Sequence, residues 1–147
     1  MVEFALASTI LIPVFIGTFQ FGYTFYVYNL LSTQIRAGAR YGSVRAFRCA
    51  DTTSIAKFKT AVANMVRFGN PDGTGTLIEP GMNASQLDVE IKDKNGVDAD
   101  ATHIPAYVTV STTSYSVDAV FKTFIFTGNP FMRFQYVGRY ASKESEP

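Results

Sequence analysis

The stretch MVEFALASTILIPVFIGTFQFGYTFYVYNLL, residues 1–31, decides the fold of this 147-residue chain. It contains one acid, Glu3, and no formal charge follows from Phe4 to Ile35. A bilayer span needs about 20 apolar residues, so the run is long enough to cross a membrane. The question is therefore what surrounds this run, and why a single acid stands at its start.

The sequence predicts one helix over residues 2–48, because no strong turn cluster interrupts them. Such a helix would be roughly 70 Å long, which no compact domain of this size can bury. Its N-terminal half is expected to lie in lipid or against other copies of itself. Pro13 lacks a backbone N–H and crowds the preceding turn, so we expect a kink near Pro13–Gly17.

The remaining chain has the composition of an ordinary soluble domain. The net charge of +1 gives no indication of a nucleic-acid surface or nucleic-acid partner. We divide the chain into residues 1–35, an apolar helix for a membrane or filament core, and residues 36–147, a globular α+β head that includes the second half of the helix. A cleavable signal peptide is not expected, because a positive leader is missing and the apolar run exceeds the usual 7–15 residues or so.

Charge placement around the apolar run is unusual for a permanent membrane anchor. Arg36 and Arg40 lie on its far side, against the positive-inside tendency. Either a positive leader precedes the given chain or the bilayer is a temporary location.

The head is predicted to be α+β, with a short second helix followed by an antiparallel sheet of three to four strands. Helical spacing of apolar residues favours a helix over 51–68. Alternation and β-forming residues predict strands over 87–92, 106–117 and 131–141, with a short additional strand over 76–79.

The residues give little support for catalysis. One histidine, His103, and one cysteine, Cys49, leave no convincing nucleophile–base pair, so we predict that the chain is not an enzyme and needs no cofactor. The segment DKNGVDAD is a weak candidate for a Ca²⁺ site, with oxygen ligands at Asp93, Asn95, Asp98 and Asp100. Because Asn95–Gly96 is a strong hairpin signal, a plain turn is the favoured reading.

Two further features suggest packing surfaces. Gly38 and Gly42 leave one helix face bare, either for a neighbouring helix of another copy or, as we favour, for packing within one subunit. The segment 118–131 is rich in phenylalanine, and it is either a subunit interface or part of the core. The candidate interface residues are Phe121, Phe124, Phe126 and Phe131.

The N-terminal motifs resemble a known family. VEFAL, then Pro13, then FQFGYTFYVYNLL and RAGARYGS are similar to the start of TadE-like pseudopilins of the tight-adherence system, within the type IV pilin class. The resemblance covers roughly residues 2–43 and implies a type IV pilin-like fold. Gln20 stands where many relatives carry an acid, and Glu3 lies nearer the start than is usual. Either a basic leader ending in glycine precedes Met1 or processing differs.

The resemblance also implies a mechanism. The precursor would sit in the inner membrane, be processed by a prepilin peptidase and enter the pilus assembly machinery. Its apolar helix would then join a homopolymer of identical helices, where Glu3 compensates the N-terminal amine of a neighbour. The residues expected to serve assembly are Glu3, Phe4, Pro13, Phe15, Gly17, Phe19, Phe21, Gly22, Tyr23, Phe25, Tyr26 and Tyr28.

The main functional expectation is a structural subunit of an extracellular pilus-like filament used in adhesion or surface attachment. The alternative is a minor pseudopilin that stays anchored in the inner membrane and acts as an assembly factor. A secreted enzyme or ligand-binding domain tethered by the helix finds little support in the residues.

Overall fold

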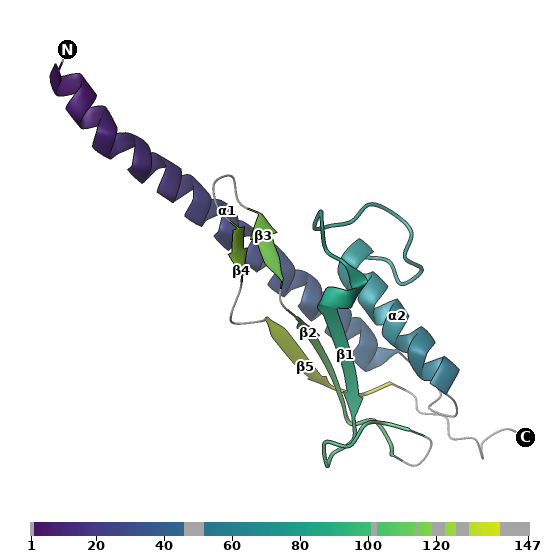
Figure 1. Ribbon diagram of the computed structural model, residues 1–147. Coiled ribbons are helices and arrows are strands. Elements are labelled where there is room, and N and C mark those ends of the chain that lie inside the picture. Colours follow the sequence, from purple (N-terminus) through teal and green to yellow (C-terminus); the bar gives the residue numbers. More distant parts are fainter. Residues whose placement is uncertain are drawn as a thin grey trace, which may run out of the picture.

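The computed structural model describes residues 2–45, 52–100, 103–113, 115–118, 123–125 and 130–138. Within these residues, a long helix is followed by a shorter one, a 3₁₀ turn and five strands (Figure 1). These elements are α1 (Val2–Val44), α2 (Thr52–Phe68), η1 (Ala84–Gln86), β1 (Leu87–Lys92), β2 (Tyr107–Thr112), β3 (Ser116–Asp118), β4 (Thr123–Ile125) and β5 (Phe131–Gln135).

The main sheet is antiparallel, with the strand order β1-β2-β5. Val89 lies opposite Val110, and Val110 lies opposite Met132. The short strands β3 and β4 form a separate antiparallel pair. The long helix, second helix and three-stranded sheet confirm the predicted α+β, pilin-like fold.

The head encloses one hydrophobic core between the two helices and the sheet. Figure 1 shows α2 beside the C-terminal half of α1, which also contacts β2 and β5. The α1 residues in this core recur every four positions, so they line one face of the helix. The core includes Val27, Leu31, Ile35 and Ala39 of α1, Phe58, Val62 and Val66 of α2, and Val89, Ile91, Val108 and Val110 of the sheet.

α1 is shorter than predicted at its C-terminal end. It ends at Val44 rather than near residue 48. The chain that follows β5 binds the carbonyl groups of its last turn: the N–H groups of Val137 and Gly138 donate to the Ser43 carbonyl at 2.8 and 3.0 Å. The hydroxyl of Tyr136 donates to the Arg45 carbonyl at 2.8 Å. The last carbonyl groups of a helix have no N–H partner within the helix, and here the chain after β5 supplies those donors.

Pro13 does not interrupt α1. The helix is continuous from Val2 to Val44, and Figure 1 shows one rod with no break near Pro13–Gly17. The missing N–H of Pro13 therefore does not break the helix.

The predicted strand over residues 76–79 is wrong. The Ile78 N–H donates to the Arg67 carbonyl at the end of α2, at 2.9 Å, so it is not available to a sheet. Glu79 is buried, and its carboxylate accepts a hydrogen bond of 3.0 Å from the Tyr115 hydroxyl. Burial, together with this neighbouring acid, raises the pKa of Tyr115. The loop thus connects the end of α2 to the segment before β3.

Candidate functional site

The N-terminal half of α1 projects from the head as a free helix (Figure 1). From Val2 to Phe19 no residue is buried, and Gln20 is the first that is. This uncovered part is about 27 Å long, close to the hydrocarbon thickness of about 30 Å in a bilayer. Among the described helices, α1 alone is long and apolar enough to cross a membrane, and its most apolar stretch has no buried share.

Most of the aromatic side chains predicted to serve assembly are exposed to solvent. Phe4 is 79% exposed and Phe19 is 74% exposed, values that are costly in water for side chains of this size. Phe21 and Phe25 stack on each other with ring centres 6.4 Å apart. The exposed aromatic residues of α1 are Phe4, Phe15, Phe19, Phe21, Tyr23, Phe25 and Tyr26, while Tyr28 is half-buried.

The hydroxyl groups of several α1 residues donate hydrogen bonds to carbonyls of the same helix. The hydroxyls of Ser8, Thr9 and Thr18 each donate to the carbonyl four residues earlier, at 2.8 Å. Thr24 and Thr33 do the same at 2.9 Å. An unsatisfied hydroxyl in an apolar medium is costly, so these bonds make the helix compatible with lipid or with a protein interior.

Glu3 carries the one formal charge of α1 before Arg36. It is exposed in the first turn, where the helix dipole favours a negative charge. Among the described residues it has no hydrogen-bond or ion-pair partner. The nearest cation on α1 is Arg36, about 50 Å away along the helix axis. A partner for Glu3 in apolar surroundings must therefore come from outside the described part of the subunit.

Gly38 and Gly42 of α1 lie inside the head. A Cβ added at Gly38 would overlap Cγ2 of Val66 on α2, and one at Gly42 would lie 3.1 Å from Val108 on β2 and from Val62. In contrast, a Cβ at Gly17 or Gly22 would meet nothing within 4 Å. The first pair therefore brings α1 close to the rest of the head, whereas the second pair lies on the free helix.

Of the candidate interface phenylalanines, Phe131 at the start of β5 is 64% exposed. Phe124 lies in β4, but its side chain is outside the description. Phe121, Phe126 and Cys49 lie outside the described residues altogether.

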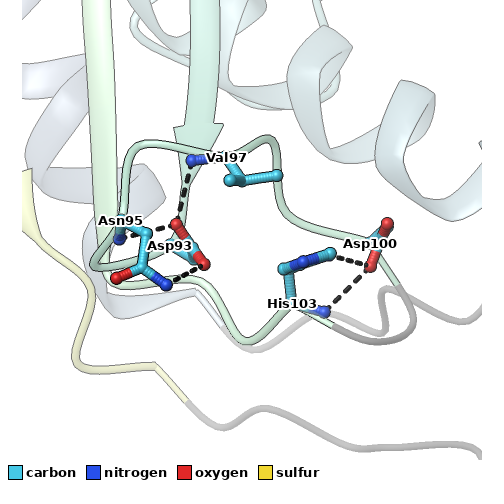
Figure 2. A network of polar contacts seen from close by, with 5 residues as sticks. All are labelled: Asp93, Asn95, Val97, Asp100 and His103. Atoms are coloured by element: carbon cyan, nitrogen blue, oxygen red, sulfur yellow. Dashed lines mark hydrogen bonds and ion pairs between the residues drawn. The ribbon is translucent and has the colours of Figure 1, made fainter.

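The weak calcium candidate forms a hairpin turn. The Asp93 carboxylate accepts hydrogen bonds from the N–H groups of Asn95 and Val97, at 2.7 and 2.9 Å, and Gly96 has a φ of +82° (Figure 2). Asp100 binds His103 in a separate network, with Nδ1 and Oδ1 2.9 Å apart. Within the described residues no cluster of three or more His, Cys, Asp or Glu could hold a metal ion.

Asp93 should give the head a component of acid sensitivity. Burial would raise the pKa of Asp93, but hydrogen bonds from Val97 and Asn95 outweigh it and hold the pKa below its usual range. The ionised Asp93 carboxylate therefore adds to the free energy of unfolding above about pH 4, the pKa of an aspartate in the unfolded chain. This contribution is lost as the pH falls through the lower pKa of Asp93 in the folded head. We expect Asp93→Asn to remove this component, measured by urea unfolding between pH 6 and pH 2, while Asp88→Asn retains it. Equal pH profiles for the wild type and Asp93→Asn would contradict the expectation.

A long apolar helix that continues into an α+β head with a three-stranded antiparallel sheet is the arrangement of a pilin-like fold. Residues 1–40 match the family model described as TadE-like protein. Over these residues the chain is therefore similar to TadE-like proteins, as the N-terminal motifs indicated. No curated protein and no solved structure matches the chain.

Proposed function

We propose that the chain is a structural, non-enzymatic subunit of an extracellular pilus-like filament used in surface attachment. The observation that carries this proposal is the free, apolar N-terminal helix on a folded head. Large exposed aromatic side chains gain free energy when a neighbour covers them, at about 25 cal/mol per Å² of apolar surface. Identical helices can supply that cover in a head-to-tail arrangement that does not close, which yields a filament.

The proposed route begins with a precursor in the inner membrane. A prepilin peptidase would process it, and the pilus assembly machinery would pass α1 from lipid to the filament core. The side-chain hydroxyls of α1 support this route, because their bonds to the helix backbone persist in both surroundings. Glu3 is the group that needs a new partner, and we assign that role to the N-terminal amine of a neighbouring copy.

The division into residues 1–35 and 36–147 remains a functional proposal. Residues 1–35 would form the membrane or filament core and residues 36–147 the head. Val27, Leu31 and Ile35 take part in both, since one side of α1 packs into the hydrophobic core of the head there. The helix and head would therefore move as one body during assembly.

A minor pseudopilin retained in the inner membrane is the second candidate. It is favoured by the uncovered length of α1, which corresponds to a single bilayer crossing. Such a protein would assist filament assembly and leave the filament itself to other subunits.

Immunogold electron microscopy of sheared surface material tests the first proposal against the second. We expect antibodies against the head to label filaments along their length, because each subunit would present its head outward. An unlabelled filament, with all of the chain in the inner-membrane fraction, would support the assembly factor instead. Cells lacking the gene provide the control for antibody specificity.

A further inference from the structure

The outer face of the main sheet carries a basic pocket that the filament proposal does not use. It has a volume of about 270 Å³ and opens at the end of the sheet next to the Asp93–Val97 turn. Its lining includes Lys92, Lys94, Asn95, Tyr107, Thr109 and Arg133. We infer that this pocket binds a carboxylate-bearing sugar unit of an acidic polysaccharide.

The strand register brings the polar groups together. Lys92 lies opposite Tyr107, and Thr109 lies opposite Arg133, so β1, β2 and β5 each contribute to one small area. Lys94 is added by the turn after β1. Three cations from separate elements thereby line one pocket, a placement that favours an anionic ligand.

Arg133 is already oriented for recognition of a carboxylate. Its Nε donates to the Thr109 hydroxyl at 3.1 Å, and its guanidinium carbon lies 5.9 Å from the centre of the Tyr107 ring. No other partner of Arg133 is present among the described residues, so its terminal nitrogens can donate in pairs to a planar carboxylate. Lys94 is exposed and likewise lacks a partner within the described ranges.

The acids near the pocket do not neutralise all of this charge. Asp93 also lines the pocket, but its carboxylate oxygens accept hydrogen bonds from Asn95 and Val97 within the turn. Glu90 pairs with Lys92 at 2.9 Å. Lys94 and Arg133 therefore remain as the cations available to a ligand.

A sugar fits these surroundings better than a simple ion. Tyr107 is 38% exposed and offers ring surface for contact with a sugar ring, while the Asn95 side chain can hydrogen-bond to hydroxyls. A second hollow of about 460 Å³ shares the Asp93–Asn95 turn as a wall and includes Ile104 and Pro105. Two neighbouring hollows that share one turn can accommodate consecutive sugar units of a polysaccharide.

Binding of an oligogalacturonate to the full-length chain in nonionic detergent tests the inference. We expect saturable binding that weakens with added salt, because exposed charges are screened. The fully methyl-esterified oligomer keeps the rings but lacks the charge, and it should bind about tenfold more weakly or worse. This measurement is independent of filament formation, so it can fail while the filament proposal holds.

Variants separate the contributions of charge and ring. Lys94→Gln and Arg133→Gln should each weaken binding, the latter about tenfold, since Arg133 makes the paired contact. Tyr107→Thr should weaken binding while retaining a β-forming residue. Lys59→Gln, which removes an exposed cation of α2, is the matched control and should bind as the wild type does. Urea unfolding of each variant verifies that the head is folded, and Lys94→Gln, in the exposed turn, serves if Arg133→Gln unfolds.

Two results would overturn the inference. One is the lack of saturable oligogalacturonate binding by the wild type. The other is equally tight binding of oligoglutamate together with an unchanged affinity in Tyr107→Thr, which would assign the pocket to acidic peptides.

Discussion

Cells that carry Glu3→Gln are expected to produce no filaments containing this chain, while the head remains folded. In the proposed filament the carboxylate of Glu3 faces the N-terminal amine of a neighbour inside an apolar bundle. Removing one partner of a buried ion pair costs about 3–5 kcal/mol, because the other charge stays buried without compensation. That cost recurs at every contact between subunits. It lowers the association constant of each contact about a hundredfold or more.

Electron microscopy of sheared material, with immunoblots of the membrane and sheared fractions, measures this result. Asp88→Asn is the matched control, because it removes one exposed carboxylate from the outer face of β1 and should leave filaments unchanged. Filaments of normal number and length in Glu3→Gln would exclude Glu3 from assembly. Loss of the protein itself from the membrane fraction would indicate impaired processing or insertion instead.

Gly38→Ala is expected to destabilise the head by about 1–3 kcal/mol, the usual cost of overpacking a core. The new methyl group would overlap Cγ2 of Val66, a β-branched side chain that cannot turn aside freely, on a buried face of α2. The Val62 carbonyl oxygen, 3.4 Å from the same position, limits the space further. α1 and α2 must therefore separate before alanine fits.

Gly17→Ala is the matched control for this prediction. It makes the same chemical change on the free part of α1, where the added Cβ meets nothing within 4 Å. Since alanine is the better helix former by about 1 kcal/mol, it should leave the head unchanged and strengthen the helix. Urea unfolding of the full chain in detergent, followed by near-UV circular dichroism of the buried Tyr115 and Tyr136, compares the two variants. Equal midpoints would contradict the packing described for Gly38.

Much of the fold could be predicted because its signals are local. The long uncharged run predicted α1, and alternation of Leu87, Val89 and Ile91 with polar residues predicted β1. The predicted strand over 106–117 ran β2 and β3 together, and β4 was not predicted, since strands of three residues are too short to show a period. Residues 76–79 have strand-like composition, but the Arg67 carbonyl takes up the Ile78 N–H, and only the tertiary structure reveals this contact.

The exposed part of α1 and the basic pocket also differ in whether the sequence reveals them. The exposed N-terminal part of α1 is visible in the sequence because its residues are contiguous and, after Glu3, uncharged. The basic pocket combines Lys94, Tyr107 and Arg133, which are far apart in the chain and meet only through the register of three strands. No local pattern marks them, so the sequence offered no signal for this pocket.

The hydroxyl groups of α1 that bond to their own helix have a consequence for the proposed transfer between lipid and filament. Ser8, Thr9 and Thr18 keep the same partners whether lipid tails or sister helices surround them. In the proposed filament they would therefore add nothing to the free-energy difference between the lipid and the filament state. The balance would rest on ring packing and on the proposed contact of Glu3 with the N-terminal amine of a neighbour. A helix built in this way could return to the bilayer without breaking an internal bond, so subunits would be reusable after retraction.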